Sequence, residues 1–386
     1  MLRQKSILFT PIKIGNTLIP NRFMRSATYE GRADEKGYPK QSLLKMMKDL
    51  ALGEVGLIVP GFVYPTKKGQ VVSDQTGMYT QSHAEAWKTT IKEIHDKTYS
   101  KIIFQICHGG AESPPELIGT IPEAPSLIKP NTHKLTIPEI QQVIQSFIDA
   151  AVNLKKVGAD GVQLHCAHGF LLSSFLSPAL NRRHDEYGGS LENRVRIVKE
   201  IATEIRKATG PDFLISAKIN GDDFDEDSDG GINPSICGWY ISQLPMIDLF
   251  EISCGVGQKA YGSRIKFDRK LYQRMITLPD DALQSIKTAK IESSGVPYFE
   301  GYNVESTKMI RKLVPKAKLA VVGGLRRFDI LEKIVKAGIC DIVSLSRPFL
   351  REPDLVKKFK NSAKESRCIS CGLCIYGNKG VRCYYP

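Results

Sequence analysis

The chain has 386 residues, of which 42% are hydrophobic and 25% are charged, a composition near the globular average that excludes disorder, collagen and coiled coil. Lys and Arg outnumber Asp and Glu by 54 to 41, which gives a net charge of +13, but acidic residues are interleaved with basic ones and no arginine-rich tract occurs. This pattern argues against nucleic-acid binding and favours a ligand that carries phosphate.

Eight short apolar runs, rich in β-branched residues and ending in small or polar residues, predict strands. In chain order these runs are Phe23 to Ala27, Gly56 to Gly61, Lys101 to Cys107, Gly161 to His165, Phe213 to Ile219, Leu249 to Ser253, Lys318 to Val322 and Asp341 to Leu345.

Longer segments with helical periodicity lie between the strands. They are Gln41 to Leu52, Ala84 to Tyr99, Ile137 to Val157, Leu191 to Thr209, Pro234 to Leu244, Val304 to Val314 and Arg327 to Ala337. Thr136 and Glu139 have the spacing of a capping box at the start of the third helix. Strands that alternate with helices predict a parallel sheet. The run of eight units without a charged or Pro-rich linker favours a closed (β/α)8 TIM barrel over an open, doubly wound sheet.

The domain organisation follows from this alternation. We expect residues 1–360 to form one barrel, with long loops at residues 62–83 and 254–299, because such barrels run from about 200 to over 400 residues. Residues 361–386 form a separate cysteine-rich tail in this prediction.

Hydrophobic runs and cysteines bear on where the protein acts. No apolar run approaches the roughly 18 to 20 residues that cross a bilayer, and the segment from Met1 to Gly15 mixes basic residues with isolated hydrophobic ones. We therefore expect neither a transmembrane span nor a secretory signal. Five of the nine cysteines lie scattered in apolar stretches, as reduced core thiols do, which predicts a cytoplasmic protein.

The ends of the seventh and eighth strands carry residues suited to an anion. Barrels commonly hold a phosphate at this place, where the backbone of Gly323 and Gly324 permits close approach and Arg347, after Ser346, supplies a counter-charge. The start of the next helix, near Arg326, would add its dipole. The alternative is that the glycine pair only makes a turn.

Three further polar residues lie on strands or at strand ends. His165 and His168 suit hydrogen-bond donation to a developing oxyanion. A zinc site is a weaker interpretation, because no third ligand is evident, and a structural pair is also open. Lys218 lies in an apolar strand, where an inward-pointing ammonium group needs an anion; an anionic reduced cofactor would supply one, unless the side chain extends to solvent.

Several motifs in the correct order resemble the Old Yellow Enzyme family of FMN-dependent ene reductases and their larger relatives, the dienoyl-CoA reductases and trimethylamine dehydrogenases. The motifs are Asn21-Arg-Phe-Met-Arg-Ser-Ala-Thr28, Phe104-Gln-Ile-Cys-His108-Gly-Gly110, His165-Cys-Ala-His168-Gly, Asp185-Glu-Tyr-Gly-Gly-Ser-Leu-Glu-Asn-Arg194, Val322-Gly-Gly324 and Ser346-Arg-Pro-Phe349. The resemblance extends from about Leu8 to Leu355.

The resemblance implies a bound FMN. Residues Ser26, Ala27, Thr28 and Gly61 would flank the flavin ring, Gln105 would bind its pyrimidine edge and Lys218 would lie where the reduced flavin carries negative charge. The resemblance places the phosphate at Gly323, Gly324, Ser346 and Arg347. It also implies that His165 and His168 bind the carbonyl or nitro oxygen of the substrate above the flavin.

Two positions depart from the family pattern. Family members usually have Arg where this chain has Lys218, so the charge is kept and the fork-shaped geometry is lost. Family ene reductases usually carry a proton-donating Tyr where this chain has Phe170. Tyr29, Tyr187, a loop residue or water are alternatives as the donor, or the reaction needs none.

The tail contains four closely spaced cysteines, Cys368, Cys371, Cys374 and Cys383. Their C-x2-C-x2-C-x8-C spacing resembles the four-iron cluster motif that follows the barrel in the larger relatives. Four thiolates of this kind also suit zinc, or they stay reduced without metal.

The resemblance predicts an FMN oxidoreductase that takes hydride from NADPH or NADH. Its acceptor would be an electron-poor small molecule, such as an α,β-unsaturated carbonyl, a quinone or a nitro compound, and no nucleic acid or membrane partner is expected. A homo-oligomer is compatible with this prediction. The alternatives are a flavin and iron–sulfur dehydrogenase of the amine-dehydrogenase type, and a flavin-binding protein without turnover.

Overall fold

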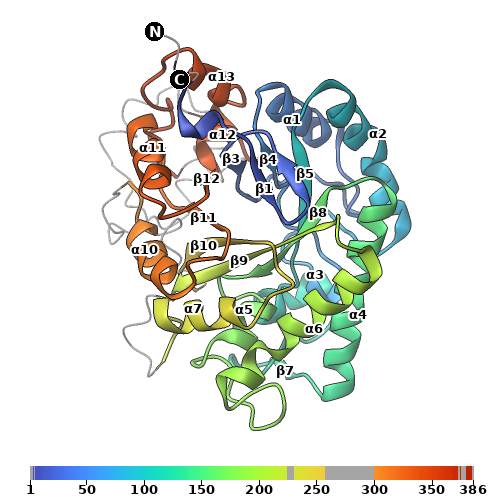
Figure 1. Ribbon diagram of the computed structural model, residues 1–386. Helices are drawn as coiled ribbons and strands as arrows, with labels where there is room; N and C mark the ends of the chain where they lie inside the picture. The colour runs from blue at the N-terminus through green and yellow to red at the C-terminus, as the bar shows by residue number, and fades with distance from the viewer. Residues whose placement is uncertain are drawn as a thin grey trace.

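The computed structural model describes residue 3 and residues 5–223, 230–256, 300–372, 374 and 380–384. Its centre is a closed barrel of eight parallel strands in the order β3, β4, β5, β8, β9, β10, β11 and β12, with β12 paired to β3 (Figure 1). The bounds of the strands are Phe23–Arg25, Leu57–Ile58, Lys101–Ile106, Gly161–Cys166, Leu214–Asp222, Leu249–Cys254, Leu319–Val322 and Ile342–Leu345. The predicted TIM barrel is therefore confirmed, and each predicted run contains or overlaps one strand.

The strands form because their residues are apolar on both faces, one face toward the barrel interior and the other toward the helices. All six residues of β8 are buried, and β8 pairs in register with β9 from Gly161 opposite Leu214 to Cys166 opposite Ile219. A Cβ at Gly161 would lie 2.1 Å from the carbonyl oxygen of Leu214, so this close strand contact requires glycine.

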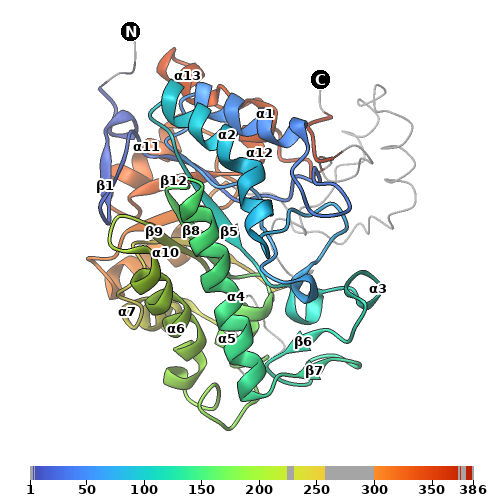
Figure 2. The ribbon, with the colours of Figure 1, turned by 90° about the vertical axis from the view of Figure 1, so that its right-hand side faces the viewer.

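A ring of helices covers the barrel in Figures 1 and 2. The principal helices are α1 (Gln41–Leu52), α2 (Gln81–Lys97), α4 (Ile137–Lys156), α6 (Leu191–Thr209), α7 (Pro234–Ser242), α10 (Val304–Leu313) and α11 (Phe328–Lys336). All seven overlap the predicted helices. The capping box is also confirmed, because the Thr136 side chain accepts from the backbone N–H of Glu139, whose carboxylate accepts from that of Thr136.

An antiparallel hairpin of β1 (Ile12–Ile14) and β2 (Thr17–Ile19) was not expected from the sequence. Ile14 and Ile19 pack with Leu57, Leu214 and Leu249, which lie at the first positions of their strands. The hairpin therefore seals the amino-terminal end of the barrel with apolar side chains, and leaves the carboxyl-terminal end for a ligand.

Shorter elements decorate the loops. They are η1 (Ile7–Phe9), η2 (Lys67–Gly69), η3 (Gly110–Glu112), α3 (Pro115–Ile118), β6 (Glu123–Ala124), β7 (His133–Lys134), α5 (Leu171–Leu176), α12 (Arg347–Arg351) and α13 (Leu355–Lys360). Figure 2 shows α3, β6 and β7 standing out from the ring of helices. Most of the predicted loop 254–299 lies outside the described residues.

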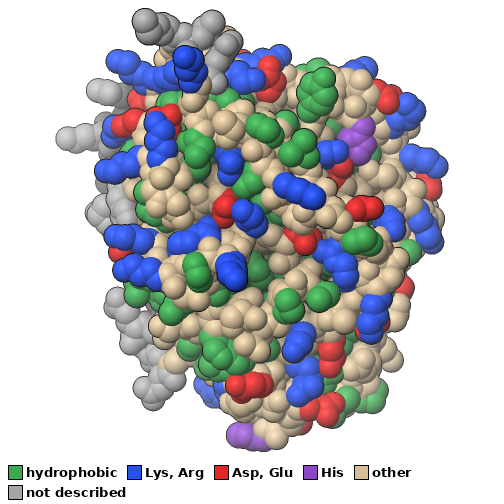
Figure 3. Space-filling model, viewed as in Figure 1, with side chains coloured by type: hydrophobic (Ala, Val, Ile, Leu, Met, Phe, Trp, Pro, Cys, Tyr) green, Lys and Arg blue, Asp and Glu red, His purple; other side chains and the backbone are tan. Residues whose placement is uncertain are grey.

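On the face shown in Figure 3, Lys and Arg side chains are scattered among Asp and Glu, so the excess positive charge does not gather into a single band there. In the described part of the chain, no helix combines the length and the apolar character that a membrane span requires.

Candidate active site

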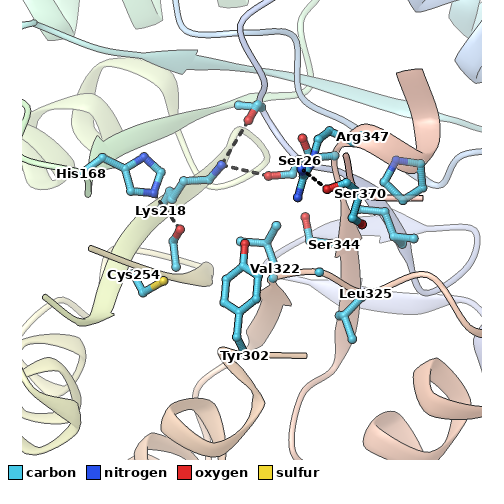
Figure 4. A pocket seen from close by; sticks show the side chains of 17 residues that line it. Ser26, His168, Lys218, Cys254, Tyr302, Val322, Leu325, Ser344, Arg347 and Ser370 are labelled. Atoms are coloured by element: carbon cyan, nitrogen blue, oxygen red, sulfur yellow. Dashed lines mark hydrogen bonds between the residues drawn. The ribbon is translucent and has the colours of Figure 1, made fainter. Parts of the chain in front are cut away.

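A pocket of about 270 Å³ opens at the carboxyl ends of the strands (Figure 4). Eight of the predicted site residues line it: Ser26, Ala27, His168, Lys218, Gly323, Gly324, Ser346 and Arg347. Other lining residues were not predicted, including Cys254, Tyr302, Ser344 and Ser370. The pocket thus runs from an end with a histidine and a lysine to an end with two glycines and an arginine.

Four predicted residues do not line this pocket: Thr28, Gly61, Gln105 and His165. The Oγ1 atom of Thr28 lies 2.6 Å from the Oγ atom of Ser346, so Thr28 supports a residue of the pocket. Gly61 donates its backbone N–H to the carboxylate of Glu30, and a Cβ at Gly61 would lie 2.0 Å from that carboxylate. The structure thus explains the glycine by its contact with Glu30.

Lys218 lies inside the barrel, with 3% of its surface exposed. Its Nζ atom donates to Ser26 Oγ at 2.9 Å and to the carbonyl oxygen of Ala27 at 3.3 Å, and lies 3.4 Å from Glu251 Oε2. Burial lowers the pKa of Lys218 from its usual value, an effect that the Glu251 carboxylate opposes. The side chain therefore does not extend to solvent, and Glu251 supplies the anion beside it.

Glu251 was missed in the sequence, although one pattern points to it. It is an acidic residue in an otherwise apolar strand, the same pattern that singles out Lys218. The two residues are partners in the register of β9 and β10, so their side chains point to the same face. Only the register reveals that they form a pair.

Further buried amides and hydroxyls surround Glu251. Gln105 donates to Gln163 at 2.7 Å, Gln163 donates to Glu251 Oε2 at 3.0 Å, and Ser344 donates to Glu251 Oε1 at 2.6 Å. All are at most 1% exposed. Gln105 is therefore part of a buried polar layer that ends at Lys218 and the pocket.

The two histidines are close together, with ring centroids 5.1 Å apart. His168 Nε2 lies 2.7 Å from Ser253 Oγ, and its backbone φ of +66° is held by a bond from its N–H to Asn220. His165 is 4% exposed and does not line the pocket, and its Nδ1 atom has no hydrogen-bond partner among the residues that the structure describes. Its unpaired nitrogen is the kind of atom that a ligand would satisfy.

The same environment keeps both imidazoles neutral. Burial, together with the nearby His168 and Lys218, holds the pKa of His165 well below its usual value. Burial and the charge of Lys218 lower the pKa of His168 to about 3. A neutral imidazole donates one hydrogen bond without carrying charge, which suits contact with a polarised oxygen.

Aromatic rings enclose the histidine end. The ring of Phe170 lies 4.8 Å from that of His165 and 5.7 Å from that of Phe62, and Tyr29 lies 6.4 Å from Phe62. The hydroxyl of Tyr29 donates to Asp74 at 2.5 Å. Of the two tyrosines considered as proton donors, Tyr29 thus belongs to this aromatic group.

The other tyrosine, Tyr187, makes polar contacts elsewhere. Its hydroxyl donates to Glu200 at 2.8 Å and accepts from Gln141 at 2.6 Å. It does not line the pocket.

The glycine and arginine end is formed by the loops after β11 and β12. Gly323 and Gly324 have φ angles of +149° and +64°, and a Cβ at Gly323 would lie 2.9 Å from the ring of Tyr302. These positions therefore favour glycine, whose backbone leaves room for an anion. Arg347 is the first residue of α12 and donates to the carbonyl oxygen of Ser370, a tail residue in the pocket wall, at 3.3 Å.

One part of the predicted anion site is occupied by the protein itself. The backbone N–H groups of Arg326 and Arg327, before α11, both donate to Glu300 Oε1 at 2.7 Å. These two N–H groups precede the first turn of α11, so the expectation that this helix start adds its dipole to the phosphate site stays a prediction.

The four tail cysteines line a second, smaller pocket together, and Arg347 lines both pockets. Burial raises the pKa of Cys368, and it raises the pKa of Cys374 to about 12. Arg351 Nη1 lies 3.8 Å from Cys383 Sγ. Among the residues that the structure describes, no group of three or more His, Cys, Asp or Glu side chains is close enough to hold a metal ion.

Comparisons with known proteins identify the family of the chain. The profile of the NADH:flavin oxidoreductase / NADH oxidase family matches residues 7–240. The chain is 31% identical to an NADH oxidase of Thermoanaerobacter brockii over 395 residues, covering 97% of this chain and 55% of the relative. It is 28% identical to an NADPH dehydrogenase of Bacillus subtilis strain 168, covering 90% of this chain and 92% of the relative.

Among solved structures, a 2-naphthoyl-CoA reductase in complex with 2-naphthoyl-CoA resembles the chain with a TM-score of 0.82 and 25% identity. The match covers 97% of this chain and 56% of that protein, so the chain spans about half the length of the reductase and of the NADH oxidase. The resemblance to Old Yellow Enzymes is confirmed, and the chain belongs to the NADH:flavin oxidoreductase / NADH oxidase family.

Proposed function

We propose that the pocket binds FMN, that NADPH or NADH reduces it, and that the acceptor is an electron-poor small molecule such as an α,β-unsaturated carbonyl, a quinone or a nitro compound. One observation carries the proposal: a single pocket joins His168 and Lys218 to a glycine and arginine cradle. When bound, FMN supplies the hydride chemistry, while the chain binds, orients and tunes it.

At the cradle, Gly323, Gly324, Ser346 and Arg347 would hold the phosphate. The glycine backbone allows N–H groups to approach, and Arg347 offers a planar pair of donors that matches phosphate oxygens. Thr28 takes part through its contact with Ser346.

At the other end, Ser26, Ala27 and Lys218 would contact the flavin ring. Lys218 is held by Ser26 and Ala27, so its charge is fixed in place. Gly61 and Gln105, which do not line the pocket, would act through the residues that do.

Above the ring, His165 and His168 would bind the oxygen of the acceptor. Because both rings are neutral, each offers one N–H donor, and a bond that strengthens as the oxygen gains charge lowers the barrier to hydride transfer. His168 reaches the pocket directly, and within the described part of the chain Nδ1 of His165 has no competing partner.

The test is an absorption spectrum of the purified protein under anaerobic conditions, before and after addition of NADPH. We expect flavin absorption bands at about 450 nm that disappear when NADPH is added and return when 2-cyclohexenone is added. A protein that neither contains nor takes up FMN would contradict the proposal, and flavin that NADPH fails to reduce would contradict the choice of electron donor.

A second function concerns the tail, residues 361–386, which we treat as a separate unit from the barrel of residues 1–360. Its four cysteines lie around one pocket beside Arg347, which also lines the main pocket. Thiolates near arginines suit an iron–sulfur cluster, and Cys368, Cys371, Cys374 and Cys383 would hold it. Such a group would carry electrons one at a time, as in a dehydrogenase of the amine-oxidising type.

Metal analysis of protein purified without oxygen tests this second function. We expect iron and acid-labile sulfide in the wild type and loss of both in Cys371→Ser. Zinc in place of iron would contradict the electron path, and absence of any metal would leave the cysteines as free thiols, which fits a reducing cytoplasm.

A further inference from the structure

Lys218 meets its own hydrogen-bonding requirements without any ligand. A lysine ammonium group has three donors, and three protein oxygens surround this one: Ser26 Oγ, the carbonyl oxygen of Ala27 and Glu251 Oε2. In Figure 4 the side chain reaches across the pocket toward Ser26. The lysine is therefore held in place before a cofactor arrives.

The partners of Glu251 show which form of the carboxyl group the fold accommodates. Among the described residues, its three polar contacts are all donors: the ammonium of Lys218, the side-chain amide of Gln163 and the hydroxyl of Ser344. An ionised carboxylate only accepts hydrogen bonds, whereas a protonated one would need an acceptor. The geometry therefore fits a carboxylate that forms a buried ion pair with Lys218.

We infer that Glu251 is a positioning residue that sets the reduction potential of the bound flavin by neutralising part of the charge of Lys218. This inference rests on the proposed function, because it needs FMN beside Lys218. Glu251 itself does not line the pocket, so its effect passes through the lysine.

The sign of the effect follows from charge balance. A hydride from NADPH carries one proton and two electrons, so NADP⁺ leaves and the flavin gains one net negative charge. A full positive charge at Lys218 stabilises that anion and raises the potential. The buried carboxylate of Glu251 opposes this stabilisation, so the reduced flavin is a stronger hydride donor than it would be beside an unpaired lysine.

The experiment measures the two-electron potential of the FMN holoenzyme against a reference dye, for the wild type and Glu251→Gln. Glutamine keeps the shape and an oxygen acceptor but removes the charge. We expect the equilibrium constant for reduction to rise about tenfold, which corresponds to about 30 mV for a two-electron couple. We also expect the rate of flavin reduction by NADPH to rise and the rate of flavin reoxidation by 2-cyclohexenone to fall. A substitution that only destabilised the fold would not change the two rates in opposite directions.

The matched control is Asp248→Asn. Asp248 immediately precedes the same strand, β10, and pairs with Arg206 at 2.6 Å, so it is also a carboxylate in an ion pair. It lies three residues, or about 10 Å of extended strand, from Glu251, toward the sealed end of the barrel. Asp248→Asn should change the flavin potential by no more than about a fifth of the shift expected for Glu251→Gln. The charge of Asp248 is screened by Arg206 and lies farther from the pocket, so its effect on the flavin is weaker.

A double-mutant cycle with Lys218→Met tests the route through the lysine. If Glu251 acts through Lys218, Glu251→Gln has little effect on the potential once the lysine is absent. A shift of the same size in both backgrounds would overturn the inference, as would an unchanged potential in Glu251→Gln. If Glu251→Gln does not fold, Glu251→Asp is the second variant, since it keeps the charge but draws it away from Lys218. We then expect a smaller rise in the potential. An unchanged or lower potential in Glu251→Asp would overturn the inference.

The cycle also separates this inference from the proposed function. If FMN binds and is reduced by NADPH, but its potential is the same in the wild type and in Glu251→Gln, only the inference is overturned. A wild-type protein that takes up no FMN would overturn both.

Discussion

The two ends of the pocket are built in different ways. The end with Lys218 and Glu251 is made by barrel strands, and the polar groups that we describe around this pair are bonded to one another. The end with Arg347 is made by loops after β11 and β12 and by Ser370 from the cysteine-rich tail. The first end is preorganised by the core, while the second depends on a segment that must dock from outside the barrel.

Side-chain contacts dock the tail. Glu352, which is 4% exposed, accepts from the hydroxyl of Ser366 at 2.7 Å and from the backbone N–H of Arg367 at 2.6 Å. Arg326 donates to the carbonyl oxygen of Cys368 at 3.4 Å. Loss of a tail contact should therefore weaken the phosphate end and leave the ring end intact.

The largest expected effect is at the phosphate end. Arg347→Ala should weaken FMN binding about 100-fold, because a charged pair of hydrogen bonds to phosphate contributes about 3 kcal/mol. Affinity for riboflavin, which lacks the phosphate, should stay the same. Titration of the apoprotein by flavin fluorescence measures both, with Arg327→Ala, an exposed arginine paired with Asp329, as the control. Equal losses for FMN and riboflavin would show that Arg347 does not bind the phosphate.

A smaller effect is expected at the ring end. Phe170→Tyr would place a hydroxyl where family ene reductases carry their proton donor, within the group of rings around His165. We expect reoxidation of the reduced flavin by 2-cyclohexenone to accelerate at least about tenfold. A well-placed general acid contributes about 100-fold or more, and a tyrosine introduced by one substitution should supply part of this. Stopped-flow measurement at one pH tests this, with Phe62→Tyr as the control. An unchanged rate would mean that proton transfer does not limit this step.

Loss of a tail anchor should have a milder effect. Glu352→Gln keeps an acceptor but removes the charge that holds Arg367 and Ser366, so hydrogen exchange at residues 366–372 should increase, and FMN affinity should fall about fivefold, or about 1 kcal/mol. Asp354→Asn is the matched control, since Asp354 shares Lys358 with Glu352 but is exposed. Faster hydrogen exchange without any loss of FMN affinity would show that phosphate binding does not depend on the docking of the tail.

The smallest effect concerns pH at the ring end. In the unfolded chain an imidazole takes up a proton below about pH 6.5, whereas the folded site keeps His168 neutral down to about pH 3. Between these values the unfolded state binds more protons, so stability falls as the pH falls. Denaturant unfolding at pH 7.5 and 5.5 should show that His168→Asn loses less stability than the wild type. An equal loss in the two proteins would contradict the neutral state of this histidine.

The sequence predicted the parts of the fold that local patterns encode. Strand runs such as Lys101 to Cys107 and helices such as Gln41 to Leu52 follow from periodicity, and the Thr136 cap follows from residue spacing. The hairpin Ile12–Ile14 with Thr17–Ile19 was missed because its strands are too short for a periodic signal.

The site was predicted where a residue type alone suggests its chemistry, as for Arg347 and His168, which both line the pocket. Contacts between distant segments were not predictable in the same way. The strand register places Glu251 beside Lys218, and the loop before α10 brings Glu300 to the start of α11. The docking of the tail brings Ser370 into the pocket wall. These pairings depend on tertiary structure, which spacing along the chain does not reveal.

The sealed end of the barrel has a consequence for the order of folding. The first barrel strand, β3, pairs with the last, β12, and Arg22 just before β3 donates to the carbonyl oxygen of Asp341. The hairpin before β3 packs on Leu214 and Leu249, which are synthesised some 200 residues later. The hairpin therefore waits for these later strands before its apolar surface is covered, so its docking is a high-contact-order step. During synthesis this uncovered apolar surface is open to aggregation.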